Sequence, residues 1–316
     1  MASLSAYPAL AELKRKDFLS SAQLTAEQTA GLLHLAADLK AGRTAIDLGR
    51  RTLGLIFSKA STRTRVSFTV AMARLGGQTI DLNPQISQVG RGEPVADTAR
   101  VLSRYCDALA IRTFAQSELE EYAHWASIPV INALTDLEHP CQALADYQTL
   151  QEAFGEIEGL TLAYVGDGNN VAHSLMLCGA LLGVNVRIGG PAGYEPSPAV
   201  LEQAQALAAG RCSISVHADP VATVRGAQAL YTDVWASMGQ EQEKAARERD
   251  FSGWCLNEEL IAEADPCAIV LHCLPAYRGL EISAGAMEGS SSRIFDQAEN
   301  RLHAQQALLA ALLGDS

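Results

Sequence analysis

Residues 52–75 read TLGLIFSKASTRTRVSFTVAMARL, and this stretch decides the fold. Its first six residues form an apolar run with the length of a buried strand, and Ser61 to Leu75 reads as a helix. Two glycines at 76–77 follow and favour the end of that helix. A buried strand that leads through a short turn into a helix begins a βαβ unit, so the segment predicts a parallel sheet.

The same alternation continues along the chain. Further strands are predicted at 78–82, 107–111, 129–132, 160–166, 184–189, 213–216, 228–235 and 268–273. Helices are predicted at 24–42, 97–105, 116–126, 140–154, 170–183, 197–210, 257–264 and 297–313. Two such series predict an α/β protein with two doubly wound parallel-sheet domains. We place these domains at 1–148 and 149–297, with the C-terminal helix 298–316 packing back on the first.

The composition narrows the class of protein. A chain of 316 residues, 48% of them hydrophobic, is long enough for two domains with sizeable cores. The net charge of -12 argues against a nucleic-acid partner, although it does not exclude a local basic pocket. Seven scattered cysteines without a C-x-x-C pair predict reduced thiols and a cytoplasmic location. We expect no membrane span, no signal peptide and no metal site, because the corresponding sequence patterns are missing.

The turn after the first strand has the residues of an anion site. Ligands of open parallel sheets bind beyond the carboxyl ends of the strands, where the segment STRTR (61–65) falls. Hydroxyl groups, the free N–H groups of a helix start and the guanidinium of Arg63 all favour phosphate there. The alternative is that Ser61 is only an N-cap and both arginines are solvated. Convergence of donors and charge favours the anion site, while Arg65 is equally suited to internal support.

Two more residues of the first series suit a carbonyl oxygen. Arg112 ends the strand in AIRTF, and His139 precedes Pro140, which suits the first position of a helix. An imidazole placed there can donate to a carbonyl oxygen. Taken alone, His139 is more often structural, but together with Arg63 and Arg112 it favours a functional role.

The second series offers groups for an amine rather than a dinucleotide. VGDGNNVAHSL (165–175) has two glycines of the dinucleotide fingerprint, but Val171 replaces the third and no acidic residue ends the next strand. Its two asparagines instead offer polar side chains. Asp233 ends a strand and suits a substrate ammonium. Cys273 also ends a strand, and either a buried structural thiol or a functional one fits that position. An anion site and an amine site together predict group transfer from an anionic donor to an amine.

The motifs resemble those of the aspartate/ornithine carbamoyltransferase superfamily. STRTR and HPCQALAD (139–146) resemble its carbamoyl-phosphate motifs. DVWASMG (233–239), HCLPAYRG (272–279) and DQAENRLHAQQALL (296–309) resemble the ornithine branch. The resemblance runs from about Lys16 to Leu312. It implies two α/β domains joined by two interdomain helices, one of them C-terminal. It also implies a homotrimer or a multiple of trimers, with the active site at the subunit interface and with no cofactor.

The resemblance assigns the first domain to carbamoyl phosphate. The residues implied to hold the phosphate are Ser61, Thr62, Arg63 and Thr64. Those implied to hold the carbamoyl group are Arg112, His139 and Gln142, with Arg301 nearby. Gln88, in ISQVGRGEP, is implied to reach the site of a neighbouring subunit.

The resemblance assigns the second domain to L-ornithine, which would receive the carbamoyl group on its δ-amine to give L-citrulline and phosphate. The implied ornithine-binding residues are Asn170, Asp233, Ser237 and Met238. Cys273 and Leu274 would lie between the two substrates. The residues expected to act in catalysis are Arg112, His139, Asp233 and Cys273.

Three alternatives stay open at this point. The same chemistry acting on putrescine or N-acetylornithine is the nearest, although the SMG loop favours an amino acid with a free carboxylate. A nicotinamide-dependent oxidoreductase and a non-catalytic binding module are the others. We expect a role in arginine biosynthesis, but the sequence also allows arginine breakdown. It leaves open the number of trimers and the protonation state of Cys273.

Overall fold

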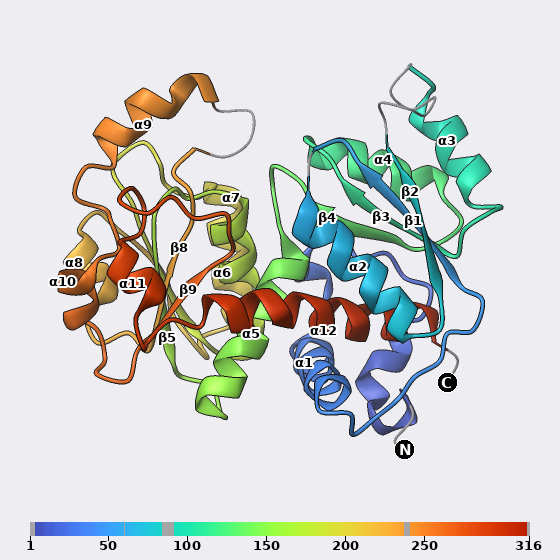
Figure 1. Ribbon diagram of the computed structural model, residues 1–316, viewed down its shortest axis with the longest axis horizontal. Coiled ribbons are helices and arrows are strands. Elements are labelled where there is room, and N and C mark those ends of the chain that lie inside the picture. Colours follow the sequence, from blue (N-terminus) through green and yellow to red (C-terminus); the bar gives the residue numbers. More distant parts are fainter. Residues whose placement is uncertain (1–3, 60, 84–91, 237–240, 315–316) are drawn as a thin grey trace. The chain divides into compact units, whose positions relative to one another are not determined.

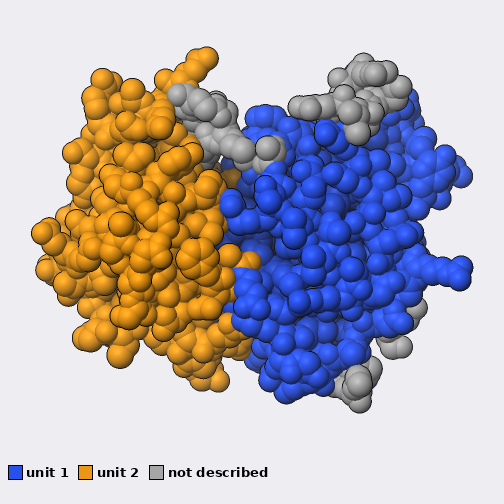
Figure 2. Space-filling model, in the orientation of Figure 1, with its two compact units in different colours: residues 1–148, 299–316 blue, residues 149–298 orange. Residues whose placement is uncertain are grey.

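The computed structural model describes residues 4–59, 61–83, 92–236 and 241–314. The chain divides into two compact units (Figure 2). Unit 1 comprises residues 1–148 and 299–316, and unit 2 comprises residues 149–298. Three of the predicted site residues, Gln88, Ser237 and Met238, lie outside the described residues.

Unit 1 is built on a four-stranded parallel sheet in the order β2-β1-β3-β4 (Figure 1). Its strands are β1 (Thr52–Phe57), β2 (Gln78–Leu82), β3 (Ala108–Arg112) and β4 (Val130–Leu134). Its helices are α1 (Ala26–Lys40), α2 (Thr62–Arg74), α3 (Val95–Leu102), α4 (Gln116–Trp125) and most of α5 (Pro140–Phe154) and α12 (Ile294–Leu313). Unit boundaries fall inside α5 and α12, the two helices expected to join the domains.

Apolar side chains from both central strands of unit 1 are buried against helices. Ile56 of β1 and Ile111 of β3 form one cluster with Leu119 and Tyr122 of α4. Residues such as Leu55 point to the opposite face and are equally buried, so the strands read as continuous apolar runs. Parallel strands need cover on both faces, which explains why the sequence shows no polar alternation here.

The order of the strands places two predicted site segments at one edge of the unit 1 sheet. Strand β1 lies between β2 and β3, so the chain turns to opposite sides of β1 after successive crossovers. Phe57 is in register with Arg112, and the N–H of Ser58 donates to the carbonyl of Arg112 over 2.8 Å. The turn into α2 and the end of β3 therefore meet at a switch point, where ligands of such sheets bind.

Unit 2 is built on a five-stranded parallel sheet in the order β7-β6-β5-β8-β9. Its strands are β5 (Thr161–Val165), β6 (Asn185–Gly189), β7 (Ile214–His217), β8 (Ala229–Thr232) and β9 (Ile269–His272). Its helices are α6 (Asn170–Leu182), α7 (Pro198–Ala208), α8 (Pro220–Val224), α9 (Lys244–Asp250), α10 (Glu258–Ala262) and α11 (Ala284–Glu288). Helices α6 and α7 cover one face, and α8, α10 and α11 cover the other (Figure 1). Strand β5 lies between β6 and β8, so the turn after β5 and Asp233 after β8 share a second switch point.

The predicted fold class is confirmed, with local differences. Helix α3 lies at Val95–Leu102 rather than at 97–105, and α12 begins at Ile294 rather than at 297. Strand β8 ends at Thr232, three residues earlier than predicted. Helices α8, α9 and α11 were not predicted, since they are too short or too polar to show an apolar stripe. In the described part of the chain, no helix is long and apolar enough to cross a membrane.

Candidate active site

Helix α2 begins at the predicted anion motif. Ser61 precedes it in an extended conformation with φ of -157°. Within the described residues its Oγ does not cap the helix, and it accepts a hydrogen bond from Arg112 Nη1 over 3.4 Å. Thr62 and Arg63 are exposed at the first turn, where backbone N–H groups have no partner inside the helix. The motif therefore presents a serine, a threonine and a guanidinium at a helix start, which suits an anion.

Arg65 supports the fold instead. Its Nε lies 2.9 Å from Asp81 Oδ2, and its guanidinium lies 5.2 Å from the centre of the Phe57 ring. These contacts tie α2 to β2 and to β1. Of the two roles that the sequence left open for Arg65, its contacts fit internal support.

Arg301 of α12 gathers three of the predicted carbamoyl-phosphate residues. Its Nη2 donates to Thr64 Oγ1 over 3.1 Å, and its Nη1 donates to Gln142 Oε1. The same Nη1 lies 3.5 Å from His139 Nε2. The Nε2 group of Gln142 donates to Asp146 Oδ1 over 2.7 Å, which fixes the amide so that its oxygen faces Arg301. Asp146 is fully buried, and sequence reasoning assigned it no role.

His139 is a neutral imidazole among arginines. Burial lowers its pKa well below the usual value, and the positive charges of Arg301, Arg112 and Arg63 lower the pKa further. Since Nε2 faces a guanidinium donor, it is the acceptor nitrogen and Nδ1 carries the proton. Such an imidazole donates a hydrogen bond without holding a charge. The three arginines around it make the site strongly attractive to a polyanion.

In unit 2, Asp233 is a buried carboxylate at the end of β8. Its Oδ1 accepts from the N–H of Val234 over 2.8 Å and from Cys273 Sγ over 3.1 Å. Its Oδ2 accepts from Asn169 Nδ2 over 3.0 Å. These three donors hold the carboxylate of Asp233, a residue that is 5% exposed, in one orientation. A carboxylate held in this way is a suitable partner for a substrate amine.

The contact between the GDGNN turn and Asp233 runs through Asn169. Its Oδ1 caps α6 by accepting from the N–H groups of Val171 and Ala172, over 2.9 and 3.3 Å. Tyr164 donates to the same oxygen over 3.4 Å, and burial raises the pKa of Tyr164 well above its usual value. The sequence pointed to Asn170, which is half-buried at the start of α6. The sequence motif pointed to Asn169 and Asn170 alike. Only the structure shows that Asn169 is the residue that caps α6 and donates to Asp233.

His272 holds the turn that follows Cys273. Its Nδ1 accepts from the N–H of Leu274 over 2.8 Å, so Nε2 carries the proton and donates to Glu281 Oε1 over 3.1 Å. Ligand atoms of Asp233, His272 and Cys273 lie within 4.8 Å of one another, as a metal site requires. Both nitrogens of His272 already make hydrogen bonds, so a metal would have to break the one to Leu274 or the one to Glu281, and the trio fits a hydrogen-bonded support better than a metal site. Sequence reasoning did not find His272 or Glu281.

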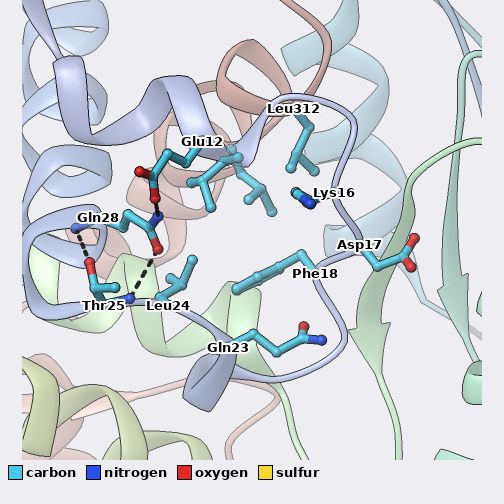
Figure 3. A pocket seen from close by; sticks show the side chains of 11 residues that line it. Glu12, Lys16, Asp17, Phe18, Gln23, Leu24, Thr25, Gln28 and Leu312 are labelled. Atoms are coloured by element: carbon cyan, nitrogen blue, oxygen red, sulfur yellow. Dashed lines mark hydrogen bonds between the residues drawn. The ribbon is translucent and has the colours of Figure 1, made fainter.

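A cavity of about 790 Å³ lies elsewhere in unit 1 (Figure 3). Phe18, Leu24, Leu308 and Leu312 line it, together with polar residues that include Glu12. Its lining residues and the predicted site residues do not overlap. The cavity is therefore separate from the chemistry described above.

Two family models match successive parts of the chain. The carbamoyl-P binding domain of aspartate/ornithine carbamoyltransferase matches residues 16–152, and its Asp/Orn binding domain matches residues 158–312. The chain belongs to the aspartate/ornithine carbamoyltransferase family. The resemblance found in the motifs is thereby confirmed, and the chain is a carbamoyltransferase.

Its relatives in this family include named ornithine carbamoyltransferases. The one from Prochlorococcus marinus (strain MIT 9313) is 73% identical over 305 residues, covering 96% of both chains. The one from Parasynechococcus marenigrum (strain WH8102) is 71% identical, covering 97% of this chain and 96% of the relative. Among solved structures, ornithine carbamoyltransferase from Pyrococcus furiosus is 46% identical with a TM-score of 0.92, covering 99% of both chains. The enzyme from Gloeobacter violaceus is 54% identical with a TM-score of 0.88, covering 95% of this chain and 99% of that structure.

Proposed function

We propose that this chain transfers the carbamoyl group of carbamoyl phosphate to the δ-amine of L-ornithine, giving L-citrulline and phosphate in arginine metabolism. The observation that carries the proposal is the neutral His139 among three arginines. A dianionic phosphate beside a carbonyl needs positive charge for the first group and a hydrogen-bond donor for the second. The named relatives that share about 70% of the sequence support ornithine as the acceptor.

In this proposal, unit 1 binds carbamoyl phosphate. The phosphate is held by the start of α2, through Ser61, Thr62, Arg63 and Thr64. Arg112 and His139 polarise the carbonyl and stabilise the tetrahedral oxyanion, each as a preorganised donor. Gln142 and Arg301 hold these groups in place and face the carbamoyl end.

Unit 2 binds ornithine in this proposal. The δ-amine resembles that of lysine, with an ordinary pKa of about 10.4, and it attacks only in its neutral form. Asp233 and Cys273 orient the amine, and Asn170, Ser237 and Met238 hold the rest of the amino acid. Cys273 and Leu274 also lie against carbamoyl phosphate, and Gln88 reaches a neighbouring subunit's site.

The proposed reaction balances without a cofactor. The amine nitrogen forms a bond to the carbamoyl carbon, and the bond from that carbon to the phosphate oxygen breaks. The ammonium form of ornithine gives one proton to the solvent before the attack, and the proton that the attacking nitrogen then releases is taken up by the departing phosphate. Most of the acceleration comes from orienting two bound substrates, an effect of roughly 7–11 kcal/mol in well-aligned systems.

We also propose a cytoplasmic homotrimer or a multiple of trimers. Strand β2 lies at an edge of the unit 1 sheet, whereas Phe18 forms a bridge to Ile131 at the other edge. Ile80 of β2 and Val66 of the neighbouring α2 are 44% and 54% exposed. An open sheet edge can pair with another chain, and exposed apolar side chains beside it add a surface that a partner can cover. In a homotrimer, a second copy of the chain covers this surface of β2 and α2.

The test is citrulline formation from carbamoyl phosphate and L-ornithine, with putrescine, N-acetylornithine and aspartate assayed in parallel. Turnover confined to ornithine is the expected result. Turnover of another amine would keep the carbamoyl donor and reject ornithine as the acceptor. A folded protein that turns over none of the four would favour a binding module instead.

A further inference from the structure

We propose that Arg247 is a positioning residue for ornithine, because it joins the turn that carries Asn169 and Asn170 to the segment that follows Asp233. The inference rests on the proposed function and assigns to it a residue that does not touch the reacting atoms. Sequence reasoning passed over this arginine, which lies in the polar helix α9.

The contacts of Arg247 connect three separate segments of unit 2. Its Nη1 donates to Asp167 Oδ2 and to the carbonyl of Trp235, both over 2.8 Å. Its Nε donates to Glu243 Oε2 over 3.0 Å, and its guanidinium lies 4.9 Å from the centre of the Tyr194 ring. The side chain is 8% exposed, which is rare for an arginine on a short surface helix.

Both anchored segments lead directly to groups that face the amine. Asp167 lies two residues before Asn169, which donates to Asp233. Trp235 lies two residues after Asp233. One guanidinium thus fixes the distance between the GDGNN turn and the chain leaving β8. Nη1 makes both of these bonds, while Nε donates to Glu243, so the guanidinium is held at two of its nitrogens. A lysine ammonium has one nitrogen and no such plane, so it does not reproduce this arrangement.

The anchored segments pack on an aromatic support. Trp235 stacks on Phe251 with 5.4 Å between ring centres, and Tyr194 lies 4.7 Å from the same ring. Trp235 and Phe251 belong to an apolar cluster of unit 2, and Tyr194 packs against it. Phe251 is the C-cap residue of α9, so the packing of its ring holds that end of the helix. The fold of this region therefore does not depend on the charge of Arg247 alone. We assign the buried ion pair between Arg247 and Asp167 the role of positioning the two anchored segments.

Charged and titratable groups from several elements surround Asp167. Burial raises the pKa of Asp167 to about 6, Arg247 lowers it, and Asp233 and Glu243 raise it. Tyr164 and Tyr194, whose own pKa values are raised, stay neutral beside it. The carboxylate is therefore ionised above about pH 6 and becomes protonated as the pH falls through that value. Protonation removes the charge that holds Arg247.

The test compares steady-state kinetics of Arg247→Met and Arg247→Lys with Arg249→Met as the matched control. Arg249 lies on the same helix and is exposed. We expect Arg247→Met to lower kcat/KM for ornithine by roughly 10²-fold, the cost of a 1 Å misplacement, with a raised KM for ornithine as part of the loss. The KM for carbamoyl phosphate should stay unchanged. Arg247→Lys should fall between this variant and the wild type, and Arg249→Met should match the wild type.

Asp167→Asn supplies a second readout that a purely structural role would not move. The ratio of its KM for ornithine to that of the wild type should be large at pH 8 and approach one below pH 6, where the wild-type carboxylate is also neutral. If both Arg247→Met and Asp167→Asn leave the KM for ornithine unchanged, or raise both KM values equally, the inference is overturned. If Arg247→Met does not fold, Arg247→Lys and Asp167→Asn decide. Absence of citrulline formation by the wild type would instead overturn the proposed function.

Discussion

Replacing Asp233 by asparagine tests the assignment of unit 2 to ornithine. The change keeps the shape of a side chain that is 5% exposed and removes one negative charge. Ornithine arrives with a protonated amine, and an ammonium and a carboxylate about 4 Å apart attract each other by roughly 4 kcal/mol at an effective dielectric constant near 20. In addition, Asp233 accepts from Asn169 with one oxygen and from Val234 and Cys273 with the other, and asparagine has only one oxygen, so a donor faces a donor on one side. A loss of about 4 kcal/mol corresponds to roughly three powers of ten in kcat/KM for ornithine.

The assay measures initial rates of citrulline formation with ornithine varied at saturating carbamoyl phosphate, and binding of carbamoyl phosphate by calorimetry. Asp219→Asn is the matched control, because Asp219 caps α8 in the same unit and asparagine caps a helix equally well. The expected result is a large fall in kcat/KM for ornithine with unchanged carbamoyl-phosphate affinity. A variant that binds carbamoyl phosphate more weakly and ornithine normally would refute the division of substrates between the two units.

Three further predictions concern unit 1. Arg63→Ala should raise the KM for carbamoyl phosphate at least tenfold without lowering the melting temperature, because Arg63 is exposed; the exposed Arg74→Ala on the same helix is the control. His139 should keep the nitrogen NMR shifts of a neutral ring from pH 8 down to pH 5.5, since its pKa is lowered well below the usual value, and protonation near pH 6.5 would contradict the neutral donor. Ile80→Glu should yield a smaller particle in light scattering, and an unchanged mass would exclude this face as the subunit interface.

The sequence was sufficient for the architecture because its physical signals are local. Strand β1 can be predicted from its own apolar run, and the start of α1 from its capping residues Thr25 and Gln28. Neither prediction needs information from the rest of the chain. The rule that ligands bind beyond the carboxyl ends of parallel strands predicts that Ser61 and Arg112 lie close together, and the hydrogen bond between them agrees with this. The short helices were missed, since a helix such as α9 has no apolar stripe and is held by tertiary contacts instead.

The supporting residues could not be found in this way. Arg301 reaches Thr64 across 237 positions of the chain, and Arg247 reaches Asp167 across 80. A charge in a polar helix resembles a solvated charge until the residues that bury it are known. Motif resemblance supplied Arg301, but Arg247 belongs to none of the recognised motifs. Asn169 and Asn170 are likewise indistinguishable by composition, and only the start of α6 gives the cap to the first of them.

The distribution of charge gives a reason why each unit takes one substrate. Unit 1 offers three positively charged guanidinium groups around His139, which burial keeps neutral. Its site therefore repels a cationic substrate and attracts an anionic one. Unit 2 offers the carboxylate of Asp233 close to Asp167, whose pKa is raised by burial and further by the charge of Asp233, so its site repels a phosphate. Like charges a few ångströms apart in a buried site cost several kcal/mol, which exceeds what one hydrogen bond returns. Electrostatics therefore directs the anionic donor to unit 1 and the cationic acceptor to unit 2 before any specific contact forms. The net charge of -12 does not oppose this sorting, because the field inside each site is set by the nearest buried groups.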